Sequence, residues 1–409
     1  MHKKLTTFTI ALLLFKLSFA QNLPSLLLNK NINSTFSITA YDEAAQEWGI
    51  AVATNNIYVG NSTIYIEPGL GAFSVIAETN PDYAINGFKQ LKAGKTIEQA
   101  INYTREKDDE FDTRQVAGID AKGNVYAFTG PALKNWKGYS SHLFGKNFVV
   151  VGNQLGDSVL VKMAYIFEHT AGRLSERLLK SLLAGQAAGG QLSGKQSAAL
   201  VVKRTNNEWF NQIDLRVDNS KTPFDDLQKL LNYHYGRIKV NQTINALKAG
   251  NIKRGEALLH DAEIMVDGWN GMYARIAEAY ILLGDDKKAI AIIKKALAEN
   301  NQWKENLSAF YCLAKDPEYQ QLIDETTFTV KDWDDAIQLM LQINHAKDAI
   351  DLAGKTLKKY PESSFTRCLL GEAWQQQGNK SDARRNLETA LKLDPNNVEA
   401  KRELGKLNM

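Results

Sequence analysis

The spacing of apolar and polar residues changes several times between residues 35 and 235. Short runs in which apolar positions alternate or cluster, such as FSITAYD (36–42) and WGIAVATN (48–55), predict β-strands. Longer runs with apolar residues three or four positions apart, such as YAINGFKQLKAG and LSERLLKSLLAG, predict helices. The expected order is three strands, two helices, three strands, two helices, two strands and a final helix.

This order indicates a layered domain. Helices that arrive in pairs between runs of mostly antiparallel strands suggest two packed β-sheets covered by helices on both outer faces. The sequence therefore predicts an α+β domain over residues 35–235, built as a four-layer αββα sandwich.

From Gly236 onward the spacing becomes helical throughout and repeats every 34 residues. The recurring positions are Gly250, Leu259 and Ala262 in one unit and Gly284, Ile293 and Ala296 in the next. A period of this length is that of the tetratricopeptide repeat, a helical hairpin whose small residues let its two helices touch. Residues 236–409 are therefore predicted to form an all-α solenoid.

The segment SFTRCLLGEAWQQQGNKSDARRNLETALKLDPNN (364–397) carries the clearest repeat. Its signature positions are Gly371, Trp374, Gly378, Ala383, Ala390 and Pro395. Residues 304–329 fit the template poorly and are expected to form an irregular insert, and a helix from about residue 398 should cap the array. Because such arrays usually bind peptides or partner proteins along a concave face, we expect a peptide or protein partner; a purely structural appendage is the alternative.

Residues 1–20, MHKKLTTFTIALLLFKLSFA, have the pattern of a signal peptide: two early lysines, an apolar stretch and a small-residue end at Ala20. Lys16 interrupts the apolar stretch, which argues against a membrane anchor. Residues 21–34 then form a leader or a propeptide, and no later stretch is long and apolar enough to span a bilayer. We expect an exported protein, periplasmic or extracellular.

Charge and composition exclude several function classes. The net charge is only +3, and the basic residues do not cluster into a stripe, so nucleic acid is not an expected partner. The six histidines never approach metal-ligand spacing, so we expect no metal centre and no cofactor. Cys312 and Cys368 are the two cysteines of the chain; a disulfide and two buried thiols both remain open.

Several stretches between residues 35 and 218 resemble one known family in the right order. They are TFSITAYD, WGIAVAT, RQVAGIDAKGNVYAFTG, VGNQL, AGGQLSGKQSAALVV and LRVD, and they are similar to the DUF1028 family over about 200 residues. The resemblance implies the fold of the N-terminal nucleophile (Ntn) hydrolases, with a substrate that is not established. Some members carry a C-terminal module suspected of binding peptidoglycan, where this chain has its repeats.

The sequence departs from the family pattern at three places. In many members the TFSI stretch follows the initiator Met, so that Thr becomes the first residue, whereas 34 residues precede Thr35 here. Val75-Ile76 stands where many relatives have Thr-Gln. Gln191 replaces the acidic residue that often follows Ala-Gly-Gly.

An N-terminal Thr can combine a nucleophilic hydroxyl with an α-amine whose pKa lies at about 7.7 to 8, so that one residue supplies both nucleophile and base. An internal Thr cannot. Catalysis by Thr35 therefore requires a cut between Ser34 and Thr35, and attack of the Thr35 hydroxyl on the Ser34 carbonyl is the chemically consistent route. The alternative is that Thr35 is an ordinary β-forming residue that starts a strand.

Two further residues are candidates for the catalytic site. Asn153 follows the strand NFVVVG, where its amide could stabilise an oxyanion or simply cap the chain. Arg114 could orient a carboxylate through two hydrogen bonds, or could pair with Asp120 or Asp218. Residues where the backbone could approach a substrate closely are Gly152, Thr129, Gly130, Gly189 and Gly190.

The leading hypothesis is an exported Ntn-type amide hydrolase that acts on a peptide or on an amidated cell-envelope compound, with the repeats recruiting a partner or substrate. The alternative is a non-catalytic envelope-binding or scaffold protein with an inactive Ntn-like domain. The N-terminus of the mature chain distinguishes the two.

Overall fold

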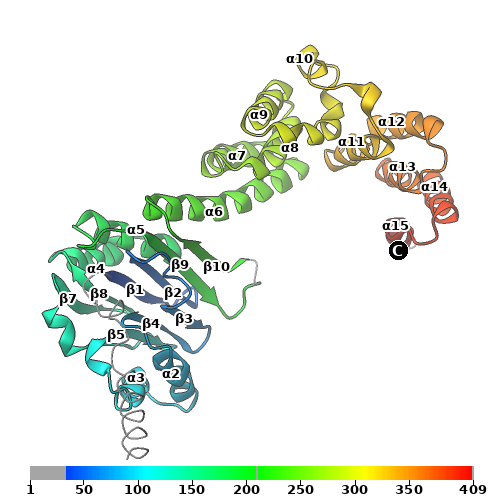
Figure 1. Cartoon of the computed structure of the whole chain (residues 1–409). Coiled ribbons are helices and arrows are strands. Elements are labelled where there is room, and N and C mark those ends of the chain that lie inside the picture. The colour runs from blue at the N-terminus through cyan, green and yellow to red at the C-terminus, as the bar shows by residue number, and fades with distance from the viewer. Residues whose placement is uncertain (1–33, 209–210, 408–409) are drawn as a thin grey trace, which may run out of the picture. The chain divides into compact units, whose positions relative to one another are not determined.

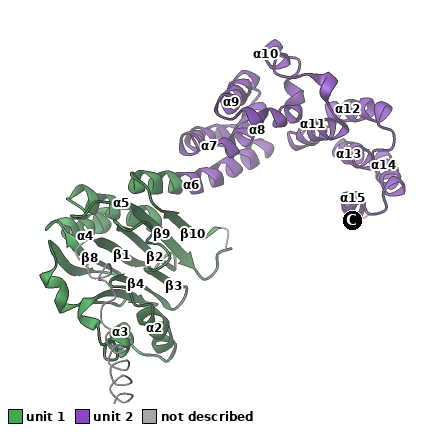
Figure 2. Cartoon of the chain, viewed as in Figure 1, with its two compact units in different colours: residues 1–231 green, residues 232–409 purple. Residues whose placement is uncertain are grey.

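The computed structural model describes residues 34–208 and 211–407, so the predicted signal peptide and all of the predicted leader but Ser34 lie outside the described residues. The chain forms two compact units that meet between Leu231 and Asn232, within helix α6 (Pro223–Lys248) (Figures 1 and 2). The sequence boundary at residues 235 and 236 falls in the same helix. No described helix is both long and apolar enough to cross a membrane.

The first unit contains two sheets in which every named strand pair is antiparallel. The larger sheet has the order β10 (Ile213–Val217), β9 (Ser197–Arg204), β2 (Glu47–Thr54), β1 (Thr35–Asp42), β8 (Phe148–Leu155) and β7 (Tyr139–Gly145). The smaller sheet has the order β3 (Ile64–Glu67), β4 (Gly71–Ala77), β5 (Arg114–Asp120) and β6 (Val125–Thr129).

The pattern of the sequence did not predict strands β3 and β7. Both lie at the edge of a sheet, where one side of the strand has no neighbour. All four residues of β3 are half-buried, and β7 has no fully buried residue. An edge strand therefore lacks the run of buried apolar residues that identifies a central strand.

Helices cover one face of each sheet. Helices α2 (Asp82–Lys92) and α3 (Ile97–Arg105) contact β4, β5 and β6, whereas α4 (Val159–His169) and α5 (Leu174–Ala187) contact the larger sheet. The two sheets contact each other most through β1, β4, β5 and β8, with further contacts that include β2 with β4 and β6 with β7. The buried residues of the cluster shared by the sheets are Val52, Val59, Ile76, Ala117, Ala127, Val149, Val151 and Ala199. The first unit is thus a mixed α/β domain with two antiparallel sheets.

Strand β1 is central to the larger sheet. It is buried from Thr35 to Tyr41 and pairs with β2 on one side and β8 on the other. In this register Thr35 lies opposite Thr54 of β2 and Asn153 of β8. The pairing therefore brings three polar residues from distant parts of the sequence to one end of the sheet.

The second unit is helical, as the repeat pattern predicted. Its helices of ten or more residues beyond α6 are α7 (Ile252–Met265), α8 (Tyr273–Leu282), α9 (Asp286–Glu299), α11 (Val330–Gln342), α12 (Ala346–Lys359), α13 (Ser364–Gln376), α14 (Lys380–Leu393) and α15 (Val398–Leu407). Between α9 and α11 the chain forms short helical turns that include η7 (Asn301–Asn306), η8 (Ser308–Leu313) and α10 (Pro317–Gln320). Cys312 and Cys368 are free thiols.

Close helix contact explains the small signature residues. A Cβ added at Gly371 of α13 would lie 2.6 Å from Cγ of Leu387 on α14. Ala383 and Ala390 on the same face of α14 are fully buried. Larger side chains at these positions would hold the two helices of the hairpin apart.

A buried carboxyl group makes the stability of this unit depend on pH. Asp334 of α11 is 4% exposed and accepts a hydrogen bond of 2.6 Å from the hydroxyl of Thr366. Burial raises the pKa of Asp334 to about 6. In the unfolded chain it titrates at about 3.9, so folding favours the protonated form. The contribution of protonated Asp334 to the free energy of unfolding is complete below pH 4 and is lost as the pH rises through 6. The loss is at most about 3 kcal/mol.

We therefore expect Asp334→Asn to flatten the pH dependence of unfolding between pH 4 and pH 7. Urea unfolding of wild type and variant across that range measures the effect, with the exposed Asp351→Asn on α12 as the control. Parallel pH profiles for wild type and Asp334→Asn would contradict the assignment.

Candidate functional site

The peptide bond between Ser34 and Thr35 lies where β1, β2 and β8 meet. Thr35 is 7% exposed, and its backbone N–H donates to Oδ1 of Asn153 at 3.2 Å. The hydroxyl of Thr35 lies 2.9 Å from the hydroxyl of Thr54. Both hydrogen-bonding groups that an N-terminal threonine would use are thus already held in place.

Three groups donate hydrogen bonds to the carbonyl oxygen of Ser34. They are Nε2 of Gln191 at 2.7 Å, Oγ1 of Thr54 at 2.9 Å and the backbone N–H of Asn55 at 3.3 Å. Donors that converge on one carbonyl oxygen polarise the carbonyl and stabilise negative charge that develops on it. We call Gln191, Thr54 and the Asn55 N–H the carbonyl cradle.

The proton positions follow from the hydrogen-bonding capacity of a hydroxyl. Thr54 has one hydroxyl proton, and that proton points to the Ser34 carbonyl. While Thr54 donates to that carbonyl, Thr35 has to be the donor in the bond between the two threonine hydroxyls. The chain Thr35 to Thr54 to Ser34 carbonyl leaves the lone pairs of the Thr35 oxygen available for attack.

Two glycines bring Gln191 to this carbonyl. The predicted substrate-binding residues Gly189 and Gly190 have φ of 116° and 53°, in the left-handed region that favours glycine. They turn the chain after α5, and Gln191 then forms a β-bridge with Leu155 at the end of β8. Sequence reasoning noted Gln191 only as a departure from an acidic residue. The change from a carboxylate to an amide was the signal in the sequence that could have identified Gln191, because an amide can donate a hydrogen bond to a carbonyl and a carboxylate cannot.

Asn153 is fully buried, and it turns a hydrogen-bond acceptor toward Thr35 where the sequence predicted a donor. It lies within β8 rather than beyond its end, and its Oδ1 faces the Thr35 nitrogen. Its Nδ2 donates to Oε1 of Gln115 at 3.0 Å, so that N–H is committed to another side chain. The side chain of Asn153 can therefore accept from an amine on Thr35, whereas the groups that donate to the Ser34 carbonyl oxygen are those of the cradle.

Gln115 of β5 fixes this orientation from the other sheet. It is fully buried, and its Nε2 lies 2.9 Å from the carbonyl oxygen of Gly152, 3.1 Å from that of Ser141 and 3.1 Å from Oγ1 of Thr129. Thr129 also contacts Nδ1 of His142, whose pKa is lowered by burial. Thr129, predicted as a substrate-binding residue, thus belongs to the network that supports Asn153.

The other predicted residues have structural contacts. Arg114 forms ion pairs with Asp108 at 2.9 Å and Glu110 at 2.8 Å, rather than with Asp120 or Asp218. Burial alone would raise the pKa of Asp108, but the hydrogen bonds from Arg114 and neighbouring groups outweigh it and lower that pKa.

Close packing accounts for two of the predicted glycines. A Cβ at Gly130 would lie 2.2 Å from the Asp112 carbonyl oxygen, and one at Gly152 would lie 2.6 Å from Cδ1 of Leu155. Neither position has room for a side chain.

Among the described residues, the side chains that hydrogen-bond to Thr35 or to the backbone of Ser34 are uncharged, including that of Asn55, whose Oδ1 accepts from the Ser34 N–H. They are Thr54, Asn55, Asn153 and Gln191. Among residues 34–208 and 211–407, no group of three or more His, Cys, Asp or Glu side chains is placed to hold a metal ion. A proton acceptor for the Thr35 hydroxyl can therefore come from Thr35 itself, once its nitrogen is a free amine.

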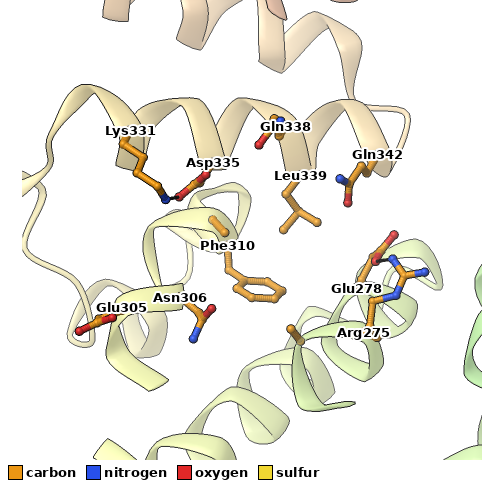
Figure 3. A pocket seen from close by; sticks show the side chains of 12 residues that line it. Arg275, Glu278, Glu305, Asn306, Phe310, Lys331, Asp335, Gln338, Leu339 and Gln342 are labelled. Atoms are coloured by element: carbon orange, nitrogen blue, oxygen red, sulfur yellow. Dashed lines mark hydrogen bonds and ion pairs between the residues drawn. The ribbon is translucent and has the colours of Figure 1, made fainter. Parts of the chain in front are cut away.

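The second unit carries a groove lined by both polar and apolar side chains, the latter including Phe310 and Leu339 (Figure 3). It has a volume of about 480 Å³ and is lined by side chains from α8, α11 and the turns η7 and η8. Two ion pairs lie along it, Arg275 with Glu278 and Lys331 with Asp335, both at 2.7 Å. Amide side chains also line the groove, among them Gln338, which lines a neighbouring pocket of about 250 Å³ as well.

Comparison with known proteins matches both units. The model of a family of unknown function, DUF1028, matches residues 35–227, and two tetratricopeptide-repeat models match residues 271–302 and 365–397. No curated protein matches the chain. A solved DUF1028 structure from Silicibacter pomeroyi is 28% identical, with a TM-score of 0.45, and the match covers 48% of this chain and 84% of that one.

Two further solved structures match the chain at lower identity. MamA from Desulfovibrio magneticus RS-1 is 16% identical with a TM-score of 0.21, and the match covers 42% of this chain and 83% of that one. YrrB, described as a tetratricopeptide protein with an unusual peptide-binding site, is 14% identical with a TM-score of 0.23, covering 41% and 90%. As its motifs predicted, the chain carries a DUF1028 domain over residues 35–227, followed by tetratricopeptide repeats.

Proposed function

We propose that the first unit is an Ntn-type amide hydrolase that cuts its own chain before Thr35 and then uses Thr35 as nucleophile. The observation that carries this proposal is the Ser34 carbonyl, which accepts three hydrogen bonds beside the Thr35 hydroxyl. A strand-end carbonyl with no chemical role needs one such partner. Two facing sheets with helices outside them are also consistent with the αββα sandwich of Ntn hydrolases.

In the first reaction the Thr35 oxygen attacks the Ser34 carbonyl carbon. The cradle stabilises the oxyanion, the C–N bond breaks, and the hydroxyl proton ends on the Thr35 nitrogen. The product is an ester between the Ser34 acyl group and the Thr35 oxygen. Water then hydrolyses the ester, which leaves a Ser34 carboxylate and a free amine and hydroxyl on Thr35.

In the second reaction the same oxygen attacks the carbonyl of an external amide. The free amine of Thr35 accepts the hydroxyl proton and passes it to the departing amine of the substrate. Oδ1 of Asn153 accepts from the Thr35 amine and so orients its lone pair. Water completes the cycle by hydrolysing the acyl-Thr35 ester.

The repeats complete the proposal as a binding region for a peptide or protein partner. The ion pairs and amides of the groove in Figure 3 can hydrogen-bond to a peptide backbone. The proposal includes export, with residues 1–20 as signal peptide, and an amide of the cell envelope as substrate. The burial of Thr35 favours the second candidate, a non-catalytic envelope-binding protein that keeps residue 34.

Gln191→Leu tests the proposed reaction. It removes the shortest bond to the Ser34 carbonyl, and we expect self-cleavage to slow by about 10² to 10³-fold, as for the loss of one oxyanion donor. Intact mass of chain made by cell-free synthesis, sampled over time, gives the rate. Thr39→Val on β1 is the matched control, since its buried hydroxyl has no partner among the described residues. Equal rates for Gln191→Leu and the control would contradict a role for the cradle.

A further inference from the structure

Residues of the first unit enclose Ser34 as they would enclose a ligand of one residue. Its N–H donates to Oδ1 of Asn55 at 2.8 Å, and its carbonyl lies in the cradle. The residue is fully buried. Both polar groups of its backbone therefore form hydrogen bonds with side chains or N–H groups of the first unit.

The side chain of Ser34, in contrast, is buried without a hydrogen bond to the described residues. Its Oγ is buried and has no hydrogen-bond partner among the described residues. A pocket that encloses a hydroxyl without bonding to it does not select for the hydroxyl, and what it selects is volume. Glycine or alanine would be accommodated at this position as well as serine, whereas a larger side chain would have to displace buried neighbours.

A buried acceptor also remains open at this place. Gln191 is only 6% exposed, and its Nε2 donates to the Ser34 carbonyl oxygen. Its Oε1, on the other side of the amide, has no hydrogen-bond partner among the described residues. An unsatisfied buried amide oxygen costs about 1 to 3 kcal/mol. A ligand with an N–H or O–H near the cradle would recover part of that cost.

We propose that the substrate is a peptide-like amide whose acyl residue takes the place of Ser34: a small residue, glycine, alanine or serine, with an α-N–H that donates to Asn55. This rests on the proposed function. One nucleophilic oxygen and one cradle serve both reactions, so the oxyanion of the substrate must form where that of Ser34 forms. The α-nitrogen and side chain of the acyl residue then fall near Asn55 and into the small pocket that cleavage vacates.

The test uses the processed chain, with Thr35 verified as its first residue by mass spectrometry. Probes are the p-nitroanilides of N-acetyl-alanine, N-acetyl-serine, N-acetyl-leucine and propionic acid. We expect kcat/KM for the alanine and serine probes to agree within about threefold, and the leucine probe to be at least about 100-fold poorer. Propionyl p-nitroanilide has the size of the alanine residue without the α-N–H, so it should also be poor.

Asn55→Ala isolates the contact to the α-nitrogen, because the backbone N–H of the cradle stays in place. It should raise KM for the N-acetyl-alanine probe at least about tenfold and raise KM for the propionyl probe by a much smaller factor. Asn56→Ala, at the exposed neighbouring position, is the control. A second readout is self-cleavage, in which Ser34→Ala should match wild type and Ser34→Leu should be slowed at least tenfold.

The outcomes separate the two proposals. A chain that never cuts itself overturns the proposed function and this inference with it. A processed chain that prefers the leucine probe, or that hydrolyses none of the anilides, overturns the small-residue inference and leaves self-cleavage standing. Cleavage of Ser34→Leu at the wild-type rate also counts against it.

Discussion

Thr35→Ala is expected to leave the bond after Ser34 uncut and to abolish any amidase activity. Alanine has no oxygen to attack the Ser34 carbonyl, so the first reaction cannot start however well the cradle holds that carbonyl. Thr35→Ser keeps the hydroxyl and should retain both self-cleavage and part of the activity. Intact mass and N-terminal sequencing of each purified variant measure the result.

The fold should survive the same substitution. Among the described residues the Thr35 hydroxyl bonds to that of Thr54, and losing this hydrogen bond costs about 1 kcal/mol. Thermal unfolding close to that of wild type is therefore the control for Thr35→Ala. An uncut Thr35→Ala chain beside a cut Thr35→Ser chain supports the mechanism; cleavage of Thr35→Ala at the same bond would exclude it.

Gln115→Leu should destabilise the first unit by about 3 kcal/mol. The substitution removes the donor to the Gly152 and Ser141 carbonyls and leaves Nδ2 of Asn153 buried without its acceptor. Each buried polar group that loses its only partner costs about 1 to 3 kcal/mol. Hydrogen exchange of the amides in β5 and β8 reports the free energy of opening of this unit without interference from the repeats.

The same variant should slow self-cleavage, because Asn153 would be free to rotate away from the Thr35 nitrogen. Gln90→Leu, a half-buried position on α2, is the control. Exchange protection equal to wild type in Gln115→Leu would show that the link between the sheets contributes little.

The sequence predicted the elements of the first unit better than their contacts. Runs such as FSITAYD (36–42) and NFVVVG (147–152) identified the central strands β1 and β8, because those strands are buried on both faces. The pairing of Thr35 with Asn153 joins residues 118 positions apart, and the Gln191 bond to Ser34 spans 157 positions. A pattern of local hydrophobicity carries no information about which strand ends meet.

The polarity of Asn153 could not be predicted for a related reason. An asparagine amide can donate or accept, and its orientation is decided by its neighbours. Here the deciding neighbour is Gln115, which comes from the other sheet. Of the predicted substrate-binding residues, Thr129 accepts a hydrogen bond from Gln115, and Gly189 and Gly190 form the turn that precedes Gln191; their binding of a substrate stays a prediction.

The repeat period predicted the second unit more completely. Each hairpin contacts mainly its sequence neighbours, so that the positions of small residues suffice to define the helix pairs. The groove was not predictable in detail, because its lining combines Arg275 and Glu278 of α8 with Lys331 and Asp335 of α11 across the irregular insert. The insert interrupts the period on which the prediction rested.

The N-terminus of the wild-type chain tests the central claim most directly. Intact-mass measurement of full-length protein, purified from the cells that make it and incubated at neutral pH, identifies the first residue. If Ser34 is held for attack by Thr35, the mature chain begins at Thr35. A mature chain that still carries Ser34 after prolonged incubation would contradict self-cleavage and favour the non-catalytic binding protein.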